Sequence, residues 1–145
     1  MKKSVFILLA ICLMGTACEK KEQSLVNSKW KLVGIMDLQK GSLTELLPKD
    51  CEQCYTLIFV AEDTLTTWSH RGEYTGIYNA NYKTNNLKII SLLWSGGLTR
   101  EIWYGAWYLH SFQQIQSFSL QKKKKELWLY YNDKKNYLLF KKIEI

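Results

Sequence analysis

The chain of 145 residues has one proline, two histidines and four cysteines, and each scarcity narrows the classes of protein to which it can belong. A single proline beside 14% aromatic and 23% charged residues is typical of a folded protein and excludes a disordered one. Two histidines without regular spacing make no zinc motif, so we expect no metal and no cofactor. The length predicts one domain with its own core.

Sequence signatures of catalysis are also missing. The chain has no Gly-x-Ser-x-Gly elbow, no glycine-rich phosphate loop and no His-Glu-x-x-His helix. Its acidic residues are scattered, without a pair spaced for acid–base chemistry. The net charge of +7 is mild and comes without a motif that reads nucleic acid. We therefore predict no enzyme, no catalytic residue and no nucleic-acid partner.

The longest apolar run is too short for a spanning helix, but it fits a secretory signal. Lys2 and Lys3 precede the uncharged residues 4–14, and the small residues Gly15-Thr16-Ala17 follow. At about 1.5 Å per residue, this run reaches only about half of a hydrocarbon core of about 30 Å. The pattern predicts a cleaved leader over residues 1–17, and a buried first helix is the alternative.

The segment Gly15-Thr16-Ala17-Cys18 resembles the lipobox of bacterial lipoproteins, in which a small residue precedes the cysteine. The resemblance implies that Cys18 is acylated, palmitate among its chains, and tied to the outer membrane of a Gram-negative bacterium. Residues 18–24 are short and polar and are expected to form a tether. Glu19-Lys20-Lys21-Glu22 is mixed in sign, so the periplasmic and surface-facing leaflets both stay open.

The body of the chain, from Leu25 onward, has the period of two that is typical of strands. Strand-like runs lie at 30–38, 54–60, 65–70, 74–82, 87–93, 126–131 and 137–143. In the first run, one buried face is expected to hold Trp30, Leu32, Gly34, Met36 and Leu38. Turn signals such as Asn132-Asp133-Lys134-Lys135 separate the runs. They predict an all-β, antiparallel up-and-down barrel of about eight strands, or a sandwich, with a short helix at 107–115.

The opening segment Leu25-Val26-Asn27-Ser28-Lys29-Trp30-Lys31-Leu32 resembles the first strand of lipocalin-like and META-type domains of bacterial lipoproteins. Residues 127–131 and 137–140 are similar to the final hairpin of those domains. The resemblance implies a lipocalin-like barrel over residues 25–145, with the tryptophan plugging its base. It also implies a binding or envelope-associated role.

Cys51 and Cys54 are close enough in sequence to pair. In an oxidising compartment we predict a structural disulfide that stiffens the entry to the next strand. A thioredoxin-like redox pair would precede a helix, whereas a strand-like run follows here, so thiol-redox chemistry is a weaker alternative. Free or metal-bound thiols are another.

Two further groups have both a functional and a structural interpretation. His70 with Arg71 suits an anion or acid–base site but is more simply an exposed turn, and His110 is expected to pack among neighbouring aromatics. The lysines of residues 122–125 fit a solvated hairpin tip, or else a surface attracted to anionic head groups.

The least regular segment concentrates large aromatic side chains, namely Trp94, Trp103, Tyr104, Trp107 and Tyr108. These residues are our candidate ligand wall, although core packing is the simpler interpretation of large aromatics in a small β protein. The leading hypothesis is a membrane-anchored, non-enzymatic envelope lipoprotein that binds a small apolar or glycan ligand, or a protein partner. The alternative is a purely structural or interaction lipoprotein whose core is filled.

Overall fold

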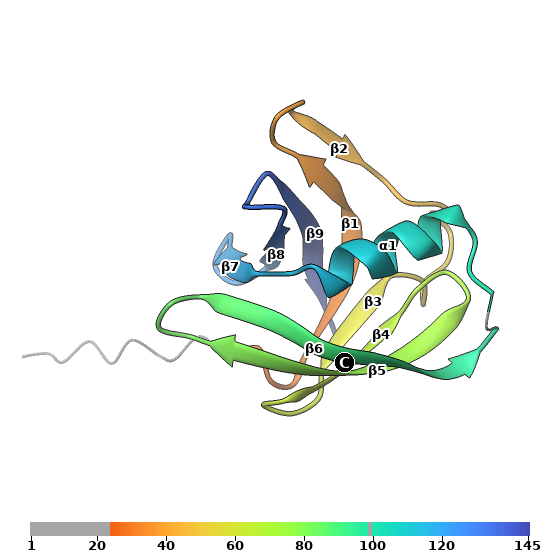
Figure 1. The fold of residues 1–145 in the computed structure, drawn as a ribbon, viewed down its shortest axis with the longest axis horizontal. Helices are drawn as coiled ribbons and strands as arrows, with labels where there is room; N and C mark the ends of the chain where they lie inside the picture. Colours follow the sequence, from red (N-terminus) through yellow and green to blue (C-terminus); the bar gives the residue numbers. More distant parts are fainter. Residues whose placement is uncertain (1–23, 99) are drawn as a thin grey trace, which may run out of the picture.

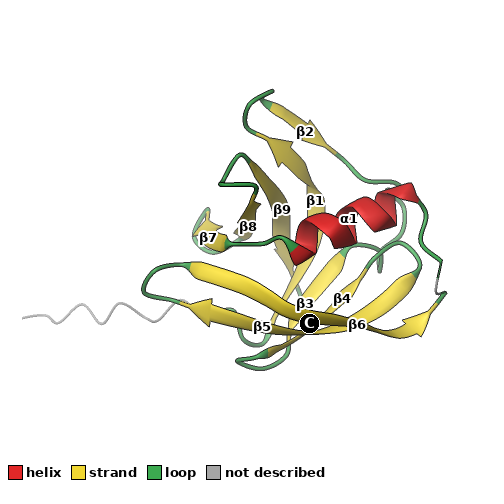
Figure 2. Ribbon diagram, viewed as in Figure 1, coloured by secondary structure: helices red, strands yellow, loops and turns green. Residues whose placement is uncertain are grey.

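A computed structural model describes residues 24–98 and 100–145; the predicted leader, Cys18 and nearly all of the tether lie outside these residues. The chain folds into nine strands and one helix (Figures 1 and 2). In chain order they are β1 (Ser28–Asp37), β2 (Ser42–Thr44), β3 (Thr56–Phe59), β4 (Thr64–Trp68), β5 (Gly72–Asn81), β6 (Asn86–Gly97), α1 (Trp103–Gln113), β7 (Ser117–Gln121), β8 (Glu126–Tyr131) and β9 (Asn136–Ile143).

The strands form one antiparallel sheet that closes on itself. Their order is β2-β1-β3-β4-β5-β6-β7-β8-β9, and β1 also pairs with β9, which completes the ring. β1 pairs with β3 through its first half and with the short β2 through its second half, so β2 lies outside the ring. This arrangement confirms the predicted antiparallel barrel with one short helix.

A β-bulge in β1 changes which side chains of that strand enter the core. The register with β9 shifts between Leu32 and Gly34, and an extra residue at a bulge reverses the inward–outward alternation beyond it. Ile35 is therefore buried, whereas Leu38 is 51% exposed. The prediction that Met36 and Leu38 continue the buried face is wrong for this reason.

The inside of the ring is filled by large side chains. Those that are buried to 98% or more include Trp30, Phe59, Tyr78, Tyr108, Phe112, Phe118 and Phe140. Trp30 donates its indole N–H to the Ser28 hydroxyl over 2.7 Å, so the one polar atom of this buried ring is satisfied. The structure places the main hydrophobic core in the space that would hold a ligand in an open barrel.

The helix begins earlier than its sequence predicted, at Trp103 instead of Trp107, and ends at Gln113. Its buried residues are Gly105, Tyr108, Ser111 and Phe112, a spacing of three and four that puts them on one face. α1 thus closes the core from one side. No helix within residues 24–98 and 100–145 combines the length and the hydrophobicity needed to cross a bilayer.

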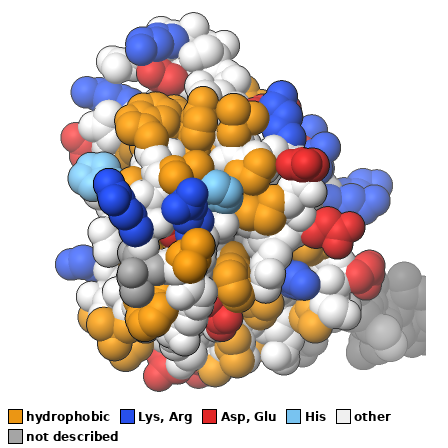
Figure 3. Space-filling view, turned by 90° about the vertical axis from the view of Figure 1, so that its right-hand side faces the viewer, with side chains coloured by type: hydrophobic (Ala, Val, Ile, Leu, Met, Phe, Trp, Pro, Cys, Tyr) orange, Lys and Arg blue, Asp and Glu red, His pale blue; other side chains and the backbone are white. Residues whose placement is uncertain are grey.

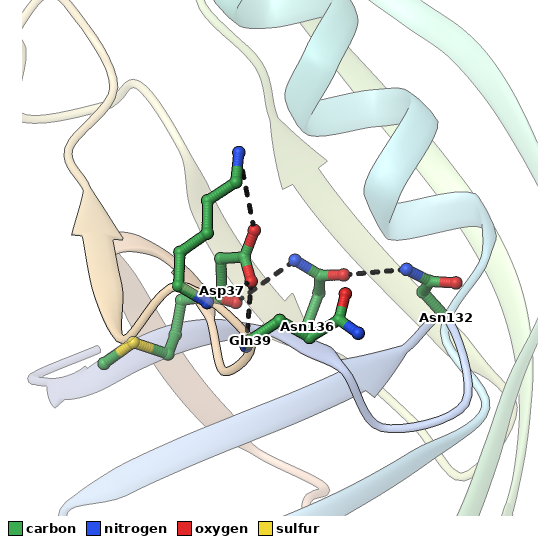
Figure 4. Close-up of polar contacts among 6 residues, drawn as sticks. Asp37, Gln39, Asn132 and Asn136 are labelled. Carbon is green, nitrogen blue, oxygen red and sulfur yellow. Dashed lines mark hydrogen bonds and ion pairs between the residues drawn. The ribbon is translucent and has the colours of Figure 1, made fainter.

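Two turns on one end of the barrel are joined by side-chain hydrogen bonds (Figure 4). The Asp37 carboxylate accepts the backbone N–H groups of Gln39 and Lys40 over 3.0 and 3.1 Å and so closes the β1–β2 turn. Asn136 donates to the Met36 carbonyl over 3.5 Å and accepts from Asn132 over 2.9 Å. These contacts tie the β1–β2 hairpin to the β8–β9 turn.

Candidate binding surface at the open side of the barrel

The ring has one incompletely paired joint, between β6 and β7. These two strands share a single residue pair, Asn86 with Ser117. Leu87 still donates its backbone N–H to the Gln116 carbonyl over 3.1 Å, but from Lys88 to Gly97 β6 pairs in the described part of the chain only with β5, although α1 contacts it. An unpaired strand edge presents rows of N–H and C=O groups to another chain. We call this edge of β6, together with α1, the open side.

The predicted aromatic cluster is divided by α1 between the core and the surface. Tyr108 is fully buried, and its hydroxyl lies 2.7 Å from the Thr67 hydroxyl, so this residue packs in the core. Trp103 is 68% exposed, and its ring lies 5.1 Å from the rings of both Tyr104 and Trp107. One turn of the helix therefore presents three aromatic side chains on or near the surface.

The neighbouring β6 also carries exposed apolar side chains. Trp94 is 49% exposed, Ile90 57% and Leu93 69%. Figure 3 views the protein from the side on which α1 begins and shows hydrophobic side chains gathered among basic ones and histidine. Contiguous exposed apolar surface usually marks an interaction site.

A polar cluster, which the sequence did not predict, lies where α1 begins. Ser69, in the β4–β5 turn, donates its hydroxyl to Glu101, and Gly72 N–H donates to the same hydroxyl over 3.1 Å. A side chain at position 105 would collide with the Glu101 carboxylate, so Gly105 is what lets the carboxylate approach the helix. Ser69 and Glu101 are 32 residues apart, and no motif links them.

Two atoms of this cluster are buried without a hydrogen-bond partner in the described part of the chain, Oε2 of Glu101 and Nδ1 of His70. Unpaired buried polar atoms are rare because each costs about 1–3 kcal/mol. His70 thus lies in a turn, as predicted, but its ring is partly enclosed.

The charge of Glu101 also acts on a buried tyrosine nearby. Burial raises the pKa of Tyr55 to about 12, and the negative charges of Glu101 and Tyr104 contribute to the rise. Tyr55 stays protonated and donates its hydroxyl to the Leu47 carbonyl over 2.6 Å. Its ring packs edge-on against Tyr108 at 5.3 Å, so the polar cluster rests on the core.

Cys51 and Cys54 form a disulfide, with their Cα atoms 5.4 Å apart. The Lys31 ammonium donates to the carbonyls of Cys51, Glu52 and Cys54, and burial lowers the pKa of Lys31. These bonds fasten the disulfide loop to β1 just before β3 begins. The loop is thus a structural staple, and a strand rather than a helix follows it.

A groove of about 920 Å³ lies at the other end of α1. Six of the residues that line it carry side-chain amides: Asn79, Asn86, Gln113, Gln114, Gln116 and Asn132. An amide both donates and accepts hydrogen bonds, so this lining suits hydroxyl-rich or peptide ligands. The groove borders the single β6–β7 pair and belongs to the open side.

His110 differs from its prediction. It is exposed on α1, because Tyr108 and Phe112 occupy the buried face beside it. Residues 24–98 and 100–145 contain no group of three or more His, Cys, Asp or Glu side chains arranged to hold a metal ion.

Comparison with known proteins agrees with the fold and finds a relative that is named as a lipoprotein. No protein-family model matches the chain. A Tannerella forsythia protein named "Putative lipoprotein" is 26% identical, and the alignment covers 97% of each chain. A DUF4847 family protein from Bacteroides vulgatus has a TM-score of 0.62 at 16% identity, covering 83% of this chain and 95% of its own. A Burkholderia xenovorans structure reaches 0.65 at 16% identity, covering 83% and 85%. None of these names states an enzymatic activity.

Proposed function

We propose that this chain is a non-enzymatic envelope lipoprotein, anchored to a membrane through acylated Cys18, that binds a protein partner at the open side of its barrel. The signal-like segment before Cys18 and the name of the Tannerella forsythia relative support the anchor. The outer membrane of a Gram-negative bacterium is its proposed location.

The proposal of a binding surface rests on the contrast between the filled interior of the ring and the unpaired edge of β6. Tyr108, Phe112 and Phe140 fill the space inside the ring, so the binding surface belongs on the outside. The free edge of β6 offers main-chain hydrogen bonds to an extended segment of a partner, and Leu93 and Trp94 offer apolar contacts. Strand addition uses both kinds of contact.

The anchor is tested by labelling growing cells with a palmitate analogue. The wild-type protein is expected to take up the label and to sediment with membranes, and the Cys18→Ala variant is expected to do neither. Equal labelling of the two proteins, or labelling of neither, would contradict the anchor.

The binding surface is tested by in-cell photo-crosslinking from single positions. A crosslinker at Leu93, 69% exposed on β6, is expected to give one discrete adduct with an envelope protein. The matched control is Val60, also 50% exposed but in the turn between β3 and β4, where we expect no such adduct. The same adducts from both positions would show that the open side is not the binding surface.

The groove at the end of α1, with its six side-chain amides, favours a second candidate function, the binding of a glycan. The groove provides paired donors and acceptors, and an oligosaccharide that extends from it along α1 would reach exposed Trp103 at the other end of the helix, on whose ring a sugar can stack. Titration with soluble envelope oligosaccharides, followed by tryptophan fluorescence, tests this. Asn79→Ala with Gln113→Ala is expected to abolish a saturable change, and Gln39→Ala, outside the groove, is expected to preserve it. If the tryptophan fluorescence of the wild-type protein did not change during the titration, the glycan-binding hypothesis would be contradicted.

A further inference from the structure

A second groove, of about 990 Å³, lies where β1 begins and β9 ends, and lysines dominate its lining. The lysines are Lys29, Lys122, Lys123, Lys124, Lys125, Lys141 and Lys142, and Glu126 and Glu144 are the acidic residues beside them. The groove joins three separate pieces of chain: the start of β1, the β7–β8 turn and the end of β9. We call it the lysine groove.

The fold brings these lysines together because β1, β8 and β9 are neighbours. The Lys142 N–H donates to the Lys125 carbonyl over 2.9 Å, and Lys141 lies opposite Glu126 in the β8–β9 pairing. Lys122 pairs with Glu126 over 2.8 Å and lowers the pKa of that carboxyl, so one lysine is compensated inside the groove. Among the described residues, none of the other six lysines of the groove forms an ion pair.

The lysine groove also carries apolar side chains at its edge. Ile143 and Ile145 line it, and Ile145 is 81% exposed. Lysines around exposed isoleucine form the arrangement of an interfacial membrane contact, in which cations meet head groups and an apolar side chain reaches below them.

The groove lies at the end of the domain where the chain enters it. Asn27, a few residues after the tether, is one of its lining residues. The seven residues from Glu19 to Leu25 span at most about 25 Å when extended. An acyl group on Cys18 therefore keeps this end of the barrel near the bilayer, within reach of a field that decays over about 8 Å in physiological salt.

We propose that the lysine groove docks on a bilayer surface rich in anionic phosphate head groups, and so holds the barrel with the groove against the membrane. Its orientation in the cell rests on the lipid anchor proposed above, but its affinity for head groups does not. The β8–β9 turn lies at the opposite end of β8 and would face away from that membrane.

Two turns of the barrel provide a matched pair of variants. The four-residue turns 122–125 and 132–135 each have three successive residues with positive φ, and each ends in two lysines. Lys124 and Lys125 correspond in position to Lys134 and Lys135. Lys124→Glu with Lys125→Glu therefore makes the same charge change, at the same backbone positions, as Lys134→Glu with Lys135→Glu at the other end.

The test uses the chain from Glu19 onward, which lacks Cys18 but keeps every buried residue of the core, all of them between Leu25 and Phe140. Binding is measured by sedimentation with vesicles of phosphatidylcholine alone and of an equal mixture with phosphatidylglycerol. We expect the protein to bind only the mixed vesicles and to lose this binding in about 1 M salt. Lys124→Glu with Lys125→Glu is expected to weaken the binding at least roughly tenfold. Lys134→Glu with Lys135→Glu is expected to leave it unaltered.

Equal weakening by both pairs of substitutions, or no binding to the mixed vesicles at low salt, would overturn the proposal. Binding to soluble polyphosphate without binding to vesicles would do so too, because it would assign the groove to a soluble polyanion. If the palmitate analogue failed to label the protein while vesicle binding persisted, only the lipid anchor would be refuted. Failure of the anchor and failure of the lysine groove are therefore distinguishable. Circular dichroism of each variant checks that it is folded.

Discussion

Tyr108 shows at the scale of one residue how packing decides the role of a side chain. Its neighbours Trp103 and Trp107 are large aromatic residues of the same helix, yet they lie on or near the surface while Tyr108 is fully buried. Burial raises the pKa of its hydroxyl, which pairs with the Thr67 hydroxyl over 2.7 Å. Thr67 also donates to the Thr56 carbonyl over 2.8 Å, so this contact links α1 to β3 and β4.

Tyr108→Phe is expected to lower the free energy of unfolding by about 1 kcal/mol, because it removes a buried hydrogen bond while its Thr67 partner keeps another. Urea unfolding of this variant, of Thr67→Val and of the double variant gives the coupling energy between the two hydroxyls. Purely additive losses would show that the two groups do not interact.

The disulfide acts on the unfolded chain more than on the folded one. Closing a loop of four residues is expected to stabilise the fold by about 2 kcal/mol. Cys51→Ala with Cys54→Ala should lower the thermal midpoint, and a reducing agent should bring the wild-type protein to the same midpoint. If the reducing agent left the thermal midpoint of the wild-type protein unchanged, and if the variant had that same midpoint, the disulfide would have no stabilising role.

At the scale of elements, the β2 hairpin depends on a glycine of β1. A Cβ atom on Gly34 would lie 2.6 Å from the backbone oxygen of Thr44, and backbone cannot move aside as a flexible side chain can. Gly34 follows the bulge that turns Ile35 into the core, so this short stretch sets both the register and the hairpin.

Gly34→Ala is therefore expected to destabilise the protein by about 1–3 kcal/mol, as overpacking does. The control is Gly96→Ala in β6, where the added Cβ meets nothing within 4 Å and the free energy of unfolding should change by less than about 0.5 kcal/mol. Chemical denaturation measures both. A similar loss for the two variants would mean that the effect is one of strand propensity rather than of contact with β2.

At the scale of the whole molecule, buried tyrosine hydroxyls make the free energy of unfolding depend on pH in the alkaline range. Burial is the main cause of a raised pKa for Tyr55, Tyr74, Tyr78, Tyr108, Tyr131 and Tyr137. In the unfolded chain a tyrosine ionises near a pKa of about 10, whereas the folded protein keeps these groups protonated. The unfolded state then binds fewer protons, so stability must fall as the pH rises.

We expect the free energy of unfolding to be constant from about pH 6 to about pH 9 and to decrease from about pH 10 through the folded-state pKa values, of which that of Tyr55 is about 12. Urea unfolding at a series of pH values, with tyrosinate absorbance read in parallel, measures this. Tyr55→Phe should make the decline shallower, since one titrating group is lost. Constant stability through pH 12 would contradict the burial of these hydroxyls.

The sequence alone determined most of the strands and the tight turns between them, although it predicted no strand at β2. Alternation of polar and apolar residues is a local property, and so are turn signals such as Asn132-Asp133-Lys134-Lys135. Both hairpin strands at the end of the chain, β8 and β9, lie within one residue of their predicted bounds. The Cys51–Cys54 pair was equally local, since three residues of separation bring the two thiols within reach.

Only the tertiary structure decided which surfaces are available for binding. Closure of β1 on β9 gathers lysines from three distant segments into one groove, and the incomplete joint between β6 and β7 leaves one strand edge open. The contact of Ser69 with Glu101 and the exposure of Leu38 likewise depend on where the helix lies and on one bulge. Such features join residues far apart in sequence, and their position depends on how all the strands pack, which no local pattern records.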